Sequence, residues 1–76
     1  MENIGKRAAM AIRERAKQNG TKIGAESLKV DVSRKTMNDW EKRNMNPSAY
    51  FLQQMAFAGY DVVWILTGEE RNSGKT

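Results

Sequence analysis

The chain of 76 residues contains no cysteine and no histidine. These absences exclude disulfide bonds, zinc sites made of cysteine and histidine, and catalysis that depends on a histidine base. No run of apolar residues approaches the roughly 20 residues that a membrane-spanning helix needs, and residues 1–5 do not begin a signal peptide. The lack of cysteine is consistent with a reducing cytoplasm, where we expect the protein, although secreted domains can lack cysteine too.

Sequence signatures of enzymes are also missing. The six glycines are isolated from one another and form no phosphate-binding loop. The acidic residues that we considered as metal ligands are Glu14, Glu26, Asp31, Asp39 and Glu41. They do not have the spacing of a metal-binding loop. We therefore expect no catalytic activity, no metal or cofactor, and no small-molecule ligand.

The size and the charge of the chain narrow the classes of function that remain. A chain this short forms one small domain with a modest core. Thirteen lysine and arginine residues against nine acidic residues give a net charge of +4. A basic surface favours an anionic partner such as nucleic acid, but it can also serve solubility alone. The choice between these two interpretations therefore depends on the motifs of the chain.

Apolar residues recur at helical spacing along the chain, and no segment alternates as a β-strand does. The sequence therefore predicts an all-α fold of five helices, separated by glycines and helix-capping residues. Their expected ranges are about 2–19, 22–29, 33–41, 47–58 and 62–66. The domain is expected to span 1–68, followed by a flexible tail at 69–76 that has no apolar residue.

The segment 32–41 is the most informative part of the chain. Ser33 is placed to cap a short helix. The inner face of this helix would carry Val32, Met37 and Trp40. The outer face would carry polar side chains that can contact phosphates or base edges, and a helix of this size fits the major groove of DNA. These outer side chains are Arg34, Lys35, Asn38 and Asp39.

Asp31 stands between the second and third expected helices, where a two-helix DNA-binding unit needs a tight turn. One residue of such a turn has a positive φ. Glycine is the usual choice, and aspartate tolerates this conformation better than most residues. Asp31 could instead cap the third helix together with Ser33. The sequence leaves both interpretations open.

Three segments, taken in order, resemble the lambda-repressor-like Cro/repressor (Xre-type) family of helix-turn-helix proteins. The first is Val-Ser-Arg-Lys-Thr-Met-Asn-Asp-Trp-Glu at 32–41, which is similar to the recognition helix of that family. The second is Asn-Pro-Ser at 46–48, and the third is Ala-Phe-Ala-Gly-Tyr-Asp-Val-Val-Trp-Ile-Leu-Thr-Gly at 56–68. The resemblance covers about 22–68. It implies a compact five-helix domain in which the second and third helices form the helix-turn-helix.

The resemblance also implies a function. The chain would be a phage Cro/repressor-type repressor, complete or part of a longer protein, that binds a palindromic operator as a homodimer in the bacterial cytoplasm, near the nucleoid. Base readout through the major groove would come from Ser33, Arg34, Lys35, Asn38 and Asp39. Phosphate contacts would come from Lys22, Lys42, Arg43 and Asn44.

Two acidic residues of the recognition helix have further expected roles. Asp39 could orient Arg34 or Lys35, or discriminate against wrong bases, instead of reading a base itself. In the family, the glutamate at the position of Glu41 pairs with an arginine of the first helix. The resemblance therefore implies an ion pair between Glu41 and one of two arginines. These are Arg13 and Arg15.

The second expected helix departs from the family pattern. Glu26 and Ser27 stand where the family has a hydrophobic residue and an alanine. Leu28 stands where the family has an exposed residue. The register of this helix is therefore open by one residue in either direction. The turn that follows also differs, because Asp31 replaces the usual glycine.

The last expected helix is apolar at every position from 62 to 66, and a helix this short cannot bury all five side chains in its own domain. We expect part of this surface to form a dimer interface made of Val62, Val63, Trp64 and Ile65. Alternatively, the patch binds another protein, and the chain is an interaction module or an antitoxin-type autoregulator. RNA binding is less favoured, because the aromatic residues look like helix-packing residues. These are Tyr50, Phe51, Phe57 and Tyr60.

Overall fold

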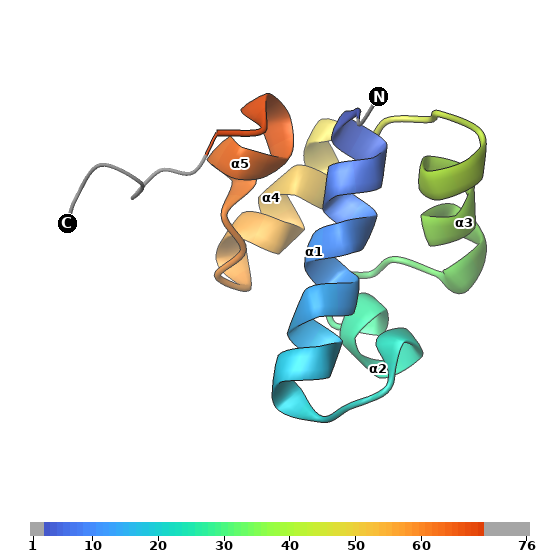
Figure 1. Cartoon of the computed structure of the whole chain (residues 1–76), viewed down its shortest axis with the longest axis vertical. Helices are drawn as coiled ribbons and strands as arrows, with labels where there is room; N and C mark the ends of the chain where they lie inside the picture. Colours follow the sequence, from blue (N-terminus) through green and yellow to red (C-terminus); the bar gives the residue numbers. More distant parts are fainter. Residues whose placement is uncertain (1–2, 70–76) are drawn as a thin grey trace, which may run out of the picture.

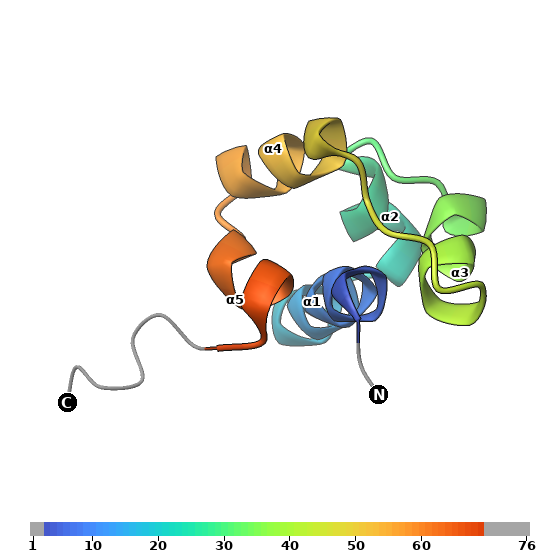
Figure 2. The same cartoon turned by 90° about the horizontal axis from the view of Figure 1, so that it is seen from above.

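The first helix is the element around which the domain is arranged. The computed structural model describes residues 3–69 and contains five helices and no strand in this range. The helices are α1 (Ile4–Asn19), α2 (Ile23–Leu28), α3 (Arg34–Lys42), α4 (Ala49–Phe57) and α5 (Val62–Thr67). Helices α2, α3 and α5 pack against α1, while α4 packs against α5 and lies across the core from α1 (Figures 1 and 2). The predicted all-α fold of five helices is confirmed. Most of the expected tail, 70–76, lies outside the described residues.

Helix α1 begins at Ile4 and not at the expected position 2, because Asn3 caps it. The Asn3 Oδ1 atom accepts a hydrogen bond from the N–H of Lys6 at 2.8 Å. Gly20 ends the helix in the left-handed conformation, with a φ of 67°. Small buried side chains let the neighbouring helices approach α1 closely. They are Ala8, Ala9 and Ala16.

Gly5 lies where the connector between α3 and α4 crosses the first turn of α1. A Cβ atom at this position would overlap the carbonyl oxygen of Met45 and would lie 3.1 Å from the carbonyl oxygen of Trp40. The missing side chain therefore lets the end of α3 and its connector rest on the backbone of α1.

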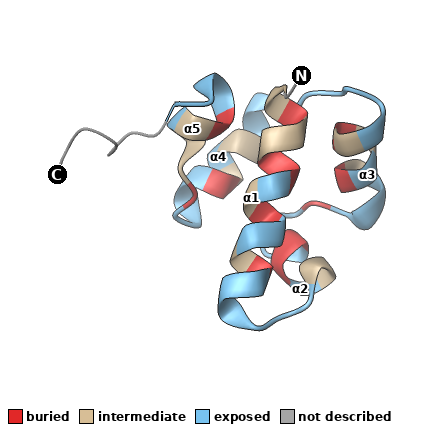
Figure 3. Ribbon diagram, viewed as in Figure 1, coloured by how far each residue is buried: buried red, intermediate tan, exposed pale blue. Residues whose placement is uncertain are grey.

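The core is formed by the inward faces of α1, α3, α4 and α5, together with the segment that joins α2 to α3, and Ile23 of α2 packs against it (Figure 3). Its largest side chains are Ile12, Val30, Val32, Met37, Trp40, Met55, Tyr60 and Ile65. Trp40 is 3% exposed, and its ring meets the ring of Phe51 edge-on with 5.7 Å between centroids. This contact fixes α3 against α4. The prediction that Met37 and Trp40 face inward is confirmed.

The aromatic residues of α4 do not all pack inward as predicted. Phe51 is partly buried and Tyr60, just after the helix, is buried. Phe57, in contrast, is 76% exposed, and Tyr50 is 49% exposed. These two share an outer face of the helix with Gln53, because residues three, four and seven apart lie on one side of a helix. The prediction is therefore wrong for Phe57 and for much of Tyr50.

Polar contacts hold both ends of α5. The Asp61 carboxylate accepts a hydrogen bond from the N–H of Trp64 at 3.1 Å and so caps the start of the helix. At the other end, Arg7 of α1 donates to the carbonyl oxygens of Ile65 at 2.8 Å and Leu66 at 3.2 Å. A helix leaves such carbonyl groups without partners at its C-terminal end. Arg7 therefore fixes the position of α5 on α1.

Candidate nucleic-acid interface

The chain turns between α2 and α3 at Asp31, whose φ of 65° is left-handed. The Asp31 N–H donates to the carbonyl oxygen of Leu28 at 3.0 Å, and the Val32 N–H donates to that of Ser27 at 2.9 Å. This is the Schellman pattern that ends many helices, here with aspartate in the place of glycine. The Asp31 carboxylate accepts a hydrogen bond from the Tyr50 hydroxyl at 2.8 Å. The expected positive φ is confirmed, and the alternative role as a cap of the next helix is wrong.

Helix α3 begins directly after Ser33, whose Oγ atom accepts a hydrogen bond from the N–H of Thr36 at 3.1 Å. Because Met37 and Trp40 are only 2% and 3% exposed, one face of the helix belongs to the core. The opposite face is polar and exposed. Its residues are Arg34, Lys35, Asn38 and Lys42. The predicted division of α3 into an inner and an outer face is confirmed for Arg34, Lys35 and Asn38, whereas Asp39 is only partly exposed.

Asp39 lies at the edge of this outer face, and its side chain is only 19% exposed. The Nζ atom of Lys35 lies 3.4 Å from one carboxylate oxygen, and the Nε atom of Arg43 lies 3.8 Å from the other. Lys35 is one of the two cations that Asp39 was expected to orient. The other, Arg34, runs beside the start of α2, where a Cβ atom on Gly24 would lie 3.7 Å from its Cδ atom.

The basic residues expected to contact phosphates are all exposed. Lys22 directly precedes α2, Lys42 ends α3, and Arg43 follows it. Asn44 has an additional, structural role. Its backbone is left-handed (φ 58°), and its Oδ1 atom accepts a hydrogen bond from the amide of Asn3 at 2.7 Å. Asn44 therefore ties the connector after α3 to the cap of α1, and its own amide nitrogen is the group left to donate to an anion.

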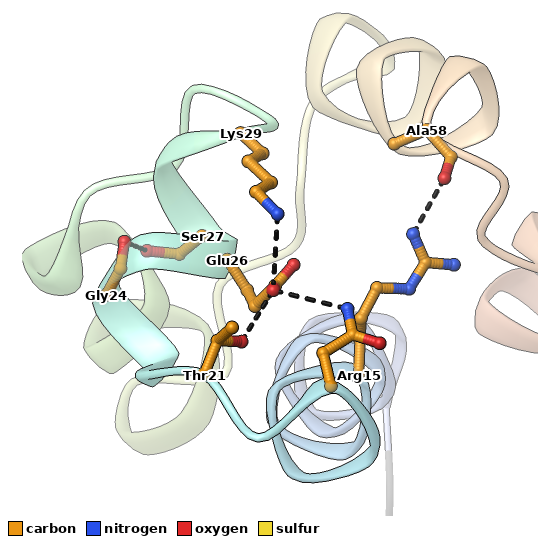
Figure 4. A network of polar contacts seen from close by, with 8 residues as sticks. Arg15, Thr21, Gly24, Glu26, Ser27, Lys29 and Ala58 are labelled. Atoms are coloured by element: carbon orange, nitrogen blue, oxygen red, sulfur yellow. Dashed lines mark hydrogen bonds and ion pairs between the residues drawn. The ribbon is translucent and has the colours of Figure 1, made fainter.

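A buried carboxylate joins α2 to the end of α1 (Figure 4). Glu26 is 1% exposed, and one oxygen accepts hydrogen bonds from the Thr21 hydroxyl at 2.6 Å and the Asn19 amide at 3.3 Å. The ammonium group of Lys29 lies 3.4 Å from the same oxygen. These donors, the Thr21 hydroxyl first, hold the pKa of Glu26 below its ordinary value and outweigh the effect of burial. Sequence reasoning noted Glu26 as a departure from the family pattern and as a carboxylate without metal-loop spacing, and it missed the partners of Glu26.

The burial of the last residues of α2 shows which of them face inward. Glu26 and Ser27 are buried, and the Ser27 hydroxyl donates to the carbonyl oxygen of Gly24 at 3.0 Å. Leu28 is 69% exposed. The three residues therefore occupy two inner positions and one outer position, which is the arrangement that the resemblance implies without a shift of register.

An ion pair links the last turns of α3 to α1. Arg13 donates to both carboxylate oxygens of Glu41, at 2.5 Å and 2.9 Å. This contact, chiefly through its hydrogen bonds, lowers the pKa of Glu41 and raises that of Arg13. Of the two expected arginines, Arg13 is therefore the partner. Arg15 instead lies 3.8 Å above the ring of Tyr60 and donates to the carbonyl oxygen of Ala58 at 2.7 Å (Figure 4).

The apolar residues of α5 divide between the core and the surface. Ile65 is completely buried. Its expected place in a dimer interface is therefore corrected, because its side chain belongs to the core of its own domain. Val62 and Trp64 are partly buried, whereas Val63 and Leu66 are 40% and 44% exposed. A dimer interface on α5 can therefore include these four side chains.

A separate hollow of about 760 Å³ lies between α1 and α5. Met10, Tyr60 and Trp64 form part of its apolar lining, and Glu14 and Arg15 are among its charged residues. Among the described residues, none that lines this hollow comes from α3. The hollow and the outer face of α3 are therefore two distinct surfaces.

Within 3–69, no group of three or more metal-ligating side chains could hold a metal ion. None of the helices in that range has both the length and the apolar composition that crossing a bilayer requires. Comparisons of the chain with protein-family models, curated proteins and solved structures found no match. The interpretation of the α3 surface therefore depends on its residues and their geometry.

Proposed function

We propose that this chain is a sequence-specific regulator of transcription that binds double-stranded DNA. In this proposal α2 and α3 form a helix-turn-helix, and α3 enters the major groove. The observation that supports it best is the two-faced character of α3. Met37 and Trp40 anchor one face in the core, and the Arg13–Glu41 pair fixes the helix on α1. The other face presents Arg34, Lys35 and Asn38 to the solvent.

These outer side chains have the chemistry for reading bases. Arginine and lysine donate to the O6 and N7 atoms of guanine, and asparagine can both donate to and accept from adenine. Arg34 and Asn38 are four residues apart and therefore lie one above the other on the helix. Ser33, at the exposed start of α3, can reach a base or a phosphate. We assign base readout to Arg34 and Asn38 first, with Lys35 and Ser33 beside them.

A second group of residues supplies affinity that does not depend on sequence. Lys22, Lys42 and Arg43 are exposed around the two helices and can each contact a phosphate. Such contacts release counterions from DNA, so that their contribution to binding weakens as the salt concentration rises.

The regulator that we propose is of the phage repressor type and acts in the bacterial cytoplasm. It occupies an operator that overlaps a promoter and so excludes RNA polymerase. A homodimer formed through Val62, Val63, Trp64 and Leu66 of α5 would read a palindromic site. The exposure of Val63 and Leu66 supports this arrangement, because apolar side chains on a short helix gain from burial against a partner.

In vitro selection from random duplex DNA, at near-physiological salt, tests the proposed function. We expect enrichment of a palindrome whose half-sites lie about one helical turn apart. Enrichment of a single half-site would support sequence reading by a monomer and contradict dimerisation. A folded protein that enriches no sequence would contradict the proposed function.

A second candidate function is binding to another protein, and the surface of α1 and α5 favours it. The hollow between these helices exposes part of Trp64, and Phe57 is 76% exposed on α4. Large exposed apolar side chains of this kind often mark protein contacts. Titration with competitor DNA separates the two candidates. A DNA reader shows salt-sensitive binding with a sequence preference, whereas a protein-interaction module shows neither.

A further inference from the structure

One acidic residue interrupts the basic surface of α3. The carboxylate of Asp39 lies between Lys35, one turn before it, and Arg43, one turn after it. The Lys35 and Arg43 side chains are 83% and 72% exposed, whereas that of Asp39 is only 19% exposed. Each cation therefore forms an ion pair with a carboxylate that is itself mostly shielded from solvent.

Arg34 and Asn38 are outside this arrangement. They lie on the neighbouring row of α3, and among the described residues Asp39 forms no ion pair with Arg34. Arg34 runs beside Gly24 of α2 instead. The polar surface of α3 and the residue after it thus contains two cations paired with Asp39 and two base-reading candidates, Arg34 and Asn38, that are not paired with it.

We propose that Asp39 is a positioning residue that makes binding selective by restraining Lys35 and Arg43. This inference depends on the proposed function, namely that α3 binds DNA. A cation paired with a carboxylate has to leave that partner before it moves to a phosphate, and phosphates are present in every DNA sequence. Asp39 therefore weakens binding to DNA of any sequence.

A preferred site is affected less by this restraint. The lysine ammonium group has three N–H donors, so Lys35 can donate to Asp39 and to a guanine in the same complex. The phosphates that Lys35 and Arg43 can reach after leaving Asp39, in contrast, are present on all DNA. Removing the carboxylate should therefore strengthen non-specific binding more than specific binding.

The test compares the wild type with Asp39→Asn, which keeps the shape of the side chain and removes its charge. The probe is a random-sequence duplex of about 20 base pairs, titrated between about 50 mM and about 200 mM salt. We expect tighter binding and a salt slope steeper by about 0.9 for each added phosphate contact. One added contact changes the ratio of the two affinities by about 3.5-fold over this range of salt. Glu14→Gln, which makes the same charge change on the exposed part of α1, is the control and should have a much smaller effect.

A double-mutant cycle shows whether Asp39 acts through the two cations. With Lys35 and Arg43 both replaced by glutamine, the Asp39→Asn change should no longer strengthen binding. An undiminished gain in that background would mean that Asp39 repels phosphates directly, and it would overturn the inference. Circular dichroism and thermal unfolding confirm that each variant is folded.

The remaining outcomes separate this inference from the proposed function. If the wild type binds DNA in a salt-dependent manner but Asp39→Asn binds no more tightly, the inference is overturned and the proposed function stands. If the folded wild type binds no duplex even at low salt, both are overturned.

Discussion

The carboxylate of Asp31 accepts a hydrogen bond from the hydroxyl of Tyr50 at 2.8 Å, while the backbone of Asp31 is left-handed. One residue thus ends α2 and also links the turn before α3 to α4. In the corresponding Schellman turns at the ends of α1 and α4, the left-handed residue is Gly20 or Gly59. Aspartate bears some backbone strain at such a position that glycine does not.

The variants Asp31→Gly and Asp31→Ala separate the backbone from the side chain. Both lose the contact with Tyr50, but alanine has in addition to adopt a positive φ. We expect Asp31→Ala to be less stable than Asp31→Gly by about 1 kcal/mol, measured as the free energy of unfolding in urea. Equal stability of the two variants would show that the backbone of this turn is not constrained.

Gly5 and Gly24 should respond in opposite ways to replacement by alanine. A Cβ atom on Gly24 meets Arg34 at 3.7 Å, which is ordinary contact, so Gly24→Ala should stabilise the protein by about 0.5–1 kcal/mol through helix propensity. A Cβ atom on Gly5 would overlap the carbonyl oxygen of Met45, so Gly5→Ala should destabilise it by about 1–3 kcal/mol. Thermal unfolding of the two variants provides the comparison. A stabilising effect at both positions would mean that the connector does not rest on α1.

The stability of the domain should decrease in acid. The pKa of Glu26 in the folded protein is below its ordinary value of 4.5. The ionised carboxylate therefore stabilises the folded state above that value, and this contribution is lost as the pH falls through the folded-state pKa. The pKa of Glu41 is lowered as well, by its contact with Arg13, and adds to the effect.

The variant Glu26→Gln isolates the contribution of the buried carboxylate. We expect it to be less stable than the wild type at about pH 7 and to differ much less from it at about pH 3, measured by urea unfolding. The amide keeps the size of the side chain but cannot carry the charge that Thr21, Asn19 and Lys29 stabilise. A stability difference that stays constant over this range of pH would contradict the lowered pKa.

Replacements on α3 and just after it should affect DNA binding in two different ways. Arg34→Ala should weaken binding to the enriched operator by about 1–3 kcal/mol and relax the base preference at one position. Arg43→Ala should weaken binding to all sequences by similar amounts and reduce the salt slope by about 1. Equilibrium titrations with operator and random duplexes measure both effects. If neither change alters operator affinity, the assignment of these two residues is wrong.

The sequence predicted the order of the helices and the orientation of α3, because those features depend on local signals. Ser33 is a capping residue in the correct place, and Met37 and Trp40 are spaced for one face of a helix. A positive φ at Asp31 was one of the two interpretations that the sequence left open, because few residues other than glycine tolerate this conformation.

Other features depend on contacts between distant segments, and spacing alone does not give them. In α5, consecutive apolar residues conceal which side faces the core, and only the structure shows that Ile65 is buried while Val63 is exposed. In α4, the apolar residues extend around the helix, so the prediction that Phe57 is a helix-packing residue is wrong. The phosphate contact of Asn44 stays a prediction, and nothing in its local sequence indicates its additional contact with Asn3.

The central claim is that the outer face of α3 binds DNA, and an NMR titration tests it most directly. The ¹⁵N-labelled protein is titrated with a random-sequence duplex at low salt, and amide shifts are followed residue by residue. We expect the largest changes at 33–43 and around Lys22, because these residues lie on or beside the proposed interface. Changes confined to the hollow between α1 and α5, or no changes at all, would contradict the claim.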